Sequence, residues 1–230
     1  MSLKLSLRPE QLKDLAVIRD IGPEKLMLIV EKLSVLDPPP VHPSDLQNAI
    51  NEVLEGPDRL LEAHTIVGQL ISLYSIRRMR GLSAQEVLDG ISYGISTAKV
   101  GWDAEGISRW KDVTSQLRDL LSLTSVWNVV KGLELSYDYP NLFQNVKILT
   151  DIRPIYDEDA SEIQGSIISY NLRIYYDTFS GGNSLSLAMD EKDVKKLMKV
   201  CERALKKAET AKKFMLTHDV KRTFICGEDE

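Results

Sequence analysis

The chain has 230 residues, of which 43% are hydrophobic and 27% are charged, as in an ordinary globular protein. Its formal net charge of −5 argues against a surface devoted throughout to nucleic acid, although a local basic patch remains compatible with it. The sequence has no N-terminal leader pattern and no apolar run of membrane-spanning length, and its two cysteines provide no disulfide framework, so we expect a cytoplasmic protein without membrane insertion.

The first 140 residues carry apolar side chains at helical spacing almost throughout. The dipeptide Gly22-Pro23 interrupts the first such stretch, and proline is well suited to the first turn of a new helix. Ser83 and Glu86 have the spacing of a capping box, which predicts a helix that begins between them. Beyond Gly22-Pro23 the spacing predicts helices at about residues 24–34, 44–54, 58–79, 84–95, 103–121 and 125–136.

The predicted helix at 58–79 has an apolar stripe that includes a histidine. Its expected members are Leu60, Leu61, His64, Val67, Leu70, Ile71 and Tyr74. We therefore expect His64 to be a hydrogen-bonded residue of the core and not a metal ligand, because no second ligand stands at metal-binding spacing.

A turn-rich stretch at Tyr137–Asn141 ends the helical half of the chain. We accordingly predict three parts: a helical domain at residues 1–140, a strand-strand-strand-helix domain at 141–216, and a flexible tail at 217–230. The expected fold class is α+β, with a small three-stranded antiparallel sheet packed on one long C-terminal helix.

The second domain is organised around the strand Ser166–Tyr176, in which apolar and polar residues alternate strictly. Further strands are expected at Val146–Tyr156 and, after a turn at residues 180–183, at about residues 184–189. The alternation places on one side of the central strand Ile168, Tyr170, Leu172, Ile174 and Tyr176.

The last helix is expected to begin at Asp190 and to reach about Met215. At 100° per residue, one of its sides is apolar and the opposite side is rich in lysine. The apolar side consists of Val194, Leu197, Met198, Cys201, Ala204, Leu205 and Ala208, and the basic side of Lys195, Lys196, Lys199, Arg203, Lys206 and Lys207. We expect Leu172 and Ile174 to pack against Leu197 and Cys201, which makes Cys201 a buried residue.

Two patterns offer catalytic alternatives. Gly90–Gly94 matches G-x-S-x-G, but that nucleophile motif needs a strand-to-helix turn, and the surrounding spacing here is helical. Asp151 and Arg153 stand two apart in a strand and therefore share a face, as a salt bridge or as part of a recognition site. Pro154 beside them indicates an edge position or a bulge.

Taken together, the helical run from Leu12 to Leu121, the strand Ile167–Tyr176, the stretch Leu185–Asp190 and the helix Val194–Leu205 are similar to the COMM-domain family. The resemblance implies a non-enzymatic adaptor subunit whose C-terminal unit pairs intimately with another such unit. It also implies a place in cytosolic assemblies linked to membrane-protein trafficking. It implies no catalytic residues and no cofactor.

The leading hypothesis is therefore a non-catalytic scaffold that forms a homodimer through its C-terminal domain, and that also binds other proteins. Candidate residues for self-association or the core are Ile168, Tyr170, Leu172, Ile174, Leu197 and Cys201. One alternative is an enzyme with a pocket near Asp151 and Arg153 or at the domain junction. A further alternative is phosphate or nucleic-acid binding through the lysine-rich helix side, although few aromatic residues stand nearby to stack on bases. No metal site and no cofactor are expected.

Overall fold

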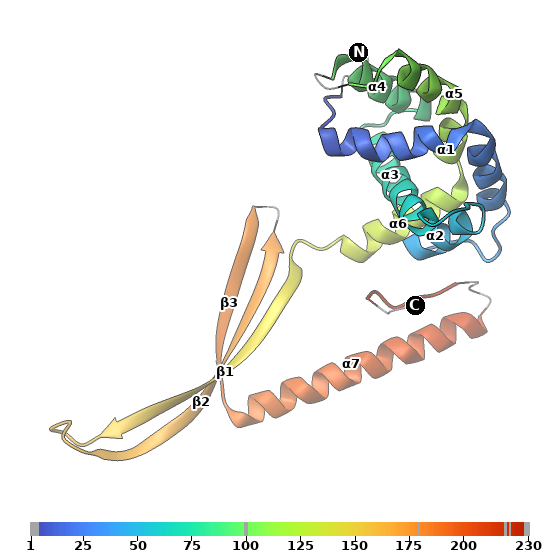
Figure 1. The fold of residues 1–230 in the computed structure, drawn as a ribbon. Coiled ribbons are helices and arrows are strands. Elements are labelled where there is room, and N and C mark those ends of the chain that lie inside the picture. Colours follow the sequence, from blue (N-terminus) through green and yellow to red (C-terminus); the bar gives the residue numbers. More distant parts are fainter. Residues whose placement is uncertain (1–4, 99–100, 179, 219, 221, 228–230) are drawn as a thin grey trace. The chain divides into compact units, whose positions relative to one another are not determined.

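The computed structural model describes residues 5–98, 101–178, 180–218, 220 and 222–227. In this part of the chain, six helices precede three strands and a seventh, C-terminal helix (Figure 1). The elements are α1 (Pro9–Ser34), α2 (Pro43–Asn51), α3 (Arg59–Met79), α4 (Ala84–Thr97), α5 (Ala104–Leu120), α6 (Thr124–Tyr137), β1 (Leu142–Tyr156), β2 (Ile163–Thr178), β3 (Gly181–Met189) and α7 (Glu191–Thr217). The α+β class predicted from the sequence is confirmed.

The chain divides into two compact units, Met1–Ser136 and Tyr137–Glu230. The division falls at the start of the turn-rich stretch at residues 137–141, which the sequence marks as a joint. We refer to the two parts as the helical unit and the C-terminal unit, and each is described by itself.

The helical unit encloses one apolar core, to which all six helices contribute. Its helices begin where the sequence places caps: the side chain of Ser83 accepts a hydrogen bond from the Glu86 amide, and Asp103 accepts one from Gly106. Gly22 has φ +84 and interrupts the helical backbone of α1, so the expected break is a kink between two helical halves. The largest side chain buried in this core is that of Trp110.

The core also explains two unusual glycines. A Cβ on Gly132 of α6 would lie 2.6 Å from the carbonyl oxygen of Val41, and a Cβ on Gly94 of α4 would lie 2.9 Å from that of Leu5. Neither position has room for a side chain, because a backbone segment crosses the helix there. Close packing thus accounts for Gly94, the last glycine of the G-x-S-x-G match.

The buried side of α3 differs from the predicted stripe. Leu60, Leu61 and His64 are exposed, and His64 lies 3.2 Å from Gln47 through its Nδ1 atom. The expectation that His64 belongs to the core is therefore wrong. The buried stripe is rotated by about one residue position, because α1, α2 and α4 pack against the side of α3 that carries Ala63, Ile66 and Leu73. The buried residues of α3 are Ala63, Ile66, Val67, Leu70, Leu73 and Tyr74.

The C-terminal unit contains an antiparallel sheet of order β1-β2-β3. Both outer strands pair with β2, but over different lengths. The β1–β2 pairing runs from Leu142 opposite Asp177 to Tyr156 opposite Ile163, whereas β3 ends where Met189 meets Tyr170. The β1–β2 ribbon therefore continues well beyond the end of β3, as Figure 1 shows. β1 and β2 are both longer than the sequence predicts.

α7 begins where expected, because the Asp190 side chain accepts a hydrogen bond from the Asp193 amide at 2.8 Å. None of its residues, all of which are described, is buried. Leu172 at the sheet centre is only 6% exposed, but Cys201 is exposed. The expectation that Leu172 and Ile174 pack on a buried Cys201 is therefore wrong, because the main contact of α7 with the sheet is at β3 and not at β2. α7 meets the sheet at β3, where the chain enters the helix. Val194, Leu197 and Ala208 of its apolar side are half-buried, whereas Met198, Cys201, Ala204 and Leu205 are exposed in a single chain.

The segment after α7 is only partly described. Arg222 to Ile225 are half-buried, while Cys226 is exposed. The last three residues lie outside the described part, and the flexibility of the tail stays a prediction.

Candidate interaction surfaces

The most unusual surface of the chain is one side of the sheet. In an antiparallel ladder, directly paired residues share a side and successive residues alternate between sides. The pairs Val146–Ile174, Ile148–Leu172 and Leu172–Leu187 therefore place apolar side chains from all three strands on the same side. We call this side the apolar sheet face. Its apolar and aromatic residues are Phe143, Val146, Ile148, Ile152, Pro154, Tyr156, Ile163, Ile168, Tyr170, Leu172, Ile174, Tyr176, Leu185, Leu187 and Met189, and Thr150, Ser166 and Asn183 lie among them.

Most of the apolar sheet face is open to solvent. Leu172 is buried by its neighbours, and Tyr170 and Ile174 are half-buried. Nine of the large apolar residues on this face have 43–67% of their surface exposed, namely Phe143, Val146, Ile148, Ile152, Tyr156, Ile163, Ile168, Leu185 and Leu187. Single exposed apolar residues are normal on protein surfaces, but a contiguous group of this size indicates an interaction site.

The opposite side of the sheet is more polar, and it carries the Asp151–Arg153 pair. The Arg153 Nη2 atom lies 3.3 Å from the Asp151 Oδ2 atom, and the two side chains are 73% and 53% exposed. An exposed pair of this kind contributes little to stability, and solvent surrounds both groups. The structure thus brings the two predicted site residues together as a surface salt bridge.

α7 adds a second open apolar surface and a strong charge. Met198, Leu205 and Leu216 on its apolar side are more than half exposed. The helix contains nine Lys or Arg and four Asp or Glu, a net charge of +5, whereas residues 137–190 contain three Lys or Arg and eight Asp or Glu, a net charge of −5. Of its lysines, Lys195 is paired with Glu191, which raises the pKa of Lys195 above its ordinary value.

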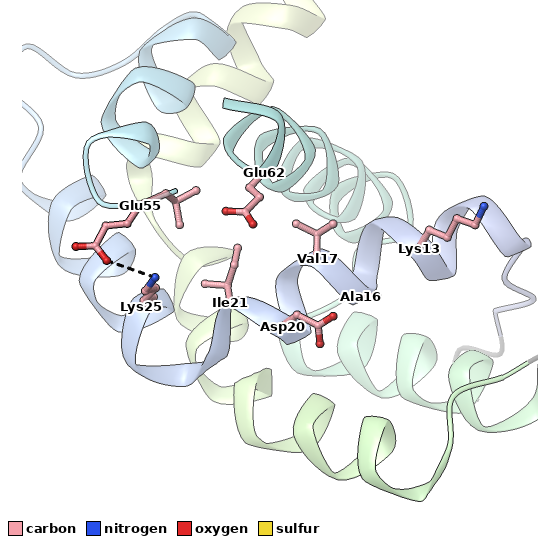
Figure 2. A pocket seen from close by; sticks show the side chains of 9 residues that line it. Lys13, Ala16, Val17, Asp20, Ile21, Lys25, Glu55 and Glu62 are labelled. Atoms are coloured by element: carbon pink, nitrogen blue, oxygen red, sulfur yellow. Dashed lines mark ion pairs between the residues drawn. The ribbon is translucent and has the colours of Figure 1, made fainter. Parts of the chain in front are cut away.

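A groove of about 430 Å³ lies on the helical unit beside the kink of α1 (Figure 2). Val17 and Ile21 line it from α1 and Glu62 from α3, while Leu54 adds a buried apolar side chain. Lys25 and Glu55 form an ion pair of 3.9 Å at its rim. The sequence does not indicate this groove, because its residues come from three separate stretches. The groove is lined by both positive and negative side chains, so its charge does not favour one class of ligand.

Asp20, at the edge of the same groove, belongs to a cluster that joins α1 to α5. Arg19 donates two hydrogen bonds to Asp20, at 2.7 and 2.9 Å, and lies 4.4 Å above the ring of Trp102. Arg109 of α5 lies 3.1 Å from the same carboxylate. The hydrogen bonds from Arg19 hold the pKa of Asp20 below its ordinary value. This cluster connects α1 to α5, and both of its arginines contact the Asp20 carboxylate.

The remaining chemical motifs take structural roles. Ser92, the serine of the G-x-S-x-G match, lies within α4 and accepts a hydrogen bond from the Trp110 indole at 3.0 Å. It therefore does not occupy a strand-to-helix turn. His218 of the C-terminal unit is exposed and stacks on Phe214, with ring centroids 3.9 Å apart. Among the described residues, no group of His, Cys, Asp and Glu has the arrangement to hold a metal ion.

Within the described ranges, no helix is both long enough and apolar enough to cross a membrane. Comparison with known proteins adds no identity: no family model matches the chain, and no curated protein is significantly similar to it. The assignment of a function therefore rests on the surfaces described above.

Proposed function

We propose that this chain is a non-catalytic interaction protein that self-associates through its C-terminal unit and carries its helical unit as a second module. The observation that supports this most is the open apolar sheet face. A three-stranded sheet needs a cover on its apolar side for stability, and a single chain leaves this side exposed from Phe143 to Tyr156.

The size of the open surface fits a stable interface. Nine side chains that are 43–67% exposed present on the order of 500 Å² of apolar surface, at roughly 100 Å² for each complete side chain. A standard interface buries about 800 Å² per partner. A symmetric dimer that covers this face in both chains would therefore supply more than half of a standard interface, to which the exposed apolar residues of α7 add further area.

The charge distribution favours the same arrangement. The sheet region carries a net −5 and α7 a net +5, so two copies attract each other wherever the sheet of one faces the helix of the other. Interaction is a better explanation than catalysis, because the Asp151–Arg153 pair is solvated and lies on the opposite side of the sheet.

The proposal is tested by light scattering coupled to size exclusion on the full chain at tens of micromolar. We expect twice the 25.9 kDa of one chain. Leu187→Lys should give the monomer, because it places an unpaired charge on the apolar sheet face. Ser186→Lys is the matched control, since the neighbouring residue of β3 points to the opposite side, and it should leave the dimer intact.

A monomeric mass for the wild-type chain would contradict the proposal. A dimer that survives Leu187→Lys unchanged would show that the copies associate through another surface. The first result would rule out self-association, and the second would place it on a part of the chain other than the apolar sheet face.

A further inference from the structure

The β1–β2 ribbon has a part that its own sheet does not support. β3 ends at Met189, which pairs with Tyr170 of β2. Past this point of the sheet, the segments Asp151–Tyr156 of β1 and Ile163–Ser169 of β2 pair only with each other among the described strands. We call these two segments and the turn between them the arm (Figure 1). At about 3.3 Å per residue, six residues of β1 give the arm a length of roughly 20 Å.

The two sides of the arm differ in chemistry. The apolar sheet face continues along one side as Ile152, Tyr156, Ile163 and Ile168, each 52–67% exposed, with the Pro154–Ser166 pair between them. The other side carries Asp151, Arg153 and Ser169 together with the isoleucines 155 and 167. An isolated two-stranded ribbon is marginally stable in water, so this arm gains order when a partner covers its apolar side.

The tip of the arm is strongly acidic, and hydrogen bonds hold its turn. Asp157, Glu158, Asp159 and Glu162 stand within six residues. Asp157 fixes the turn, since its carboxylate accepts hydrogen bonds from the Ser161 amide at 2.7 Å and the Ser161 hydroxyl at 2.6 Å. These hydrogen bonds lower the pKa of Asp157 and keep it charged. The other three carboxylates are exposed and project a negative field from the end of the arm.

We propose that the arm is a clasp that holds a second copy of this chain, with its apolar side against the other copy and its acidic tip beside the lysine-rich side of that copy's α7. This inference rests on the proposed self-association and specifies which element secures it. The clasp is the two-stranded continuation of the apolar sheet face, and it differs from the three-stranded central part because β3 does not extend along the arm.

A second copy fits the arm for three reasons. The apolar side of the arm is continuous with the apolar sheet face, so one partner covers both without a gap. α7 offers apolar residues such as Leu205 beside lysines such as Lys206, which is the combination that an apolar arm with an acidic tip requires. At 1.5 Å per residue, α7 is about 40 Å long and spans the roughly 20 Å of the arm with length to spare.

Two neighbouring isoleucines of β2 test the apolar part of the clasp. Ile168 is 60% exposed on the apolar side of the arm, and Ile167 is 57% exposed on the other side. Sedimentation equilibrium should show a dimer dissociation constant raised by about 100-fold or more in Ile168→Lys, because the new charge is buried without a partner. Ile167→Lys is the matched control, and we expect its dissociation constant to stay within about threefold of wild type.

The outcomes separate the clasp from the function on which it rests. If Leu187→Lys abolishes the dimer while Ile168→Lys and Ile167→Lys leave it equally strong, the copies associate but the arm is not the clasp. If the wild-type chain is itself a monomer, both proposals fail. Circular dichroism of each variant checks that the strands are intact, which is expected because both isoleucines are exposed in the single chain.

Carbodiimide cross-linking tests the contact of the tip, since this reagent joins a carboxylate directly to a neighbouring amine. An equal mixture of isotopically labelled and unlabelled chains distinguishes cross-links between copies from those within one copy. We expect peptides in which residues 157–162 of one copy are joined to a lysine of α7 in the other. Cross-links found only within single chains, or none from the tip to α7, would overturn the proposed contact.

Discussion

Leu172→Ala provides a direct measure of the sheet core, because Leu172 is the one residue of the described strands that is buried. The substitution removes about three carbons, which are worth roughly 0.8 kcal/mol each on burial. The flanking Ile148 and Leu187 are 46% and 43% exposed, so water enters the vacated space and little cavity remains. We therefore expect the free energy of unfolding of the C-terminal unit to fall by about 2–3 kcal/mol.

The chain allows this effect to be assigned to one unit. Its three tryptophans, at positions 102, 110 and 127, all lie in the helical unit, so tryptophan fluorescence follows the unfolding of that unit alone. Circular dichroism follows both units. In denaturant, Leu172→Ala should shift the transition seen by circular dichroism and leave the fluorescence transition in place.

Leu149→Ala is the control, because Leu149 is 44% exposed on the opposite side of the sheet and should cost less than about 1 kcal/mol. Equal small effects from both substitutions would show that the apolar sheet face is not the side that β2 buries. A parallel shift of the fluorescence transition would show that the two units unfold together.

Two further substitutions examine the helical unit. Gly132→Ala should lower the free energy of unfolding of this unit by about 2 kcal/mol or more, because the new methyl group meets the Val41 carbonyl. Gly68→Ala has open space and should stabilise α3 by roughly 0.5–1 kcal/mol. Thermal melts of the two variants compare these effects. Because the pKa of Asp20 is lowered on folding, its carboxylate stabilises the helical unit above its unfolded pKa near 3.8, and this contribution is lost as the pH falls through the folded pKa. Asp20→Asn should therefore flatten the loss of stability below about pH 4, as measured by fluorescence-detected unfolding across pH.

The candidate surface was only partly visible in the sequence. Alternation in β2 identified Ile168, Tyr170, Leu172 and Ile174 as one side of a strand, and their pairing in the sheet bears this out. The extent of the apolar sheet face was not predictable, because it depends on how far β1 and β2 pair with each other past the end of β3. The groove beside α1 left no local signal, since its residues are brought together only by folding.

The sequence by itself determined the order of the elements, their caps and the apolar side of each strand, because these depend on periods of 2 and 3.6 residues and on contacts a few positions apart. Tertiary structure decided what covers each apolar side. It turned α3 so that Ala63 and not His64 faces the core, brought Val41 against Gly132, and left Cys201 and the arm uncovered. The physical reason is that burial depends on the element that packs opposite, and a local pattern records only which side is able to be buried.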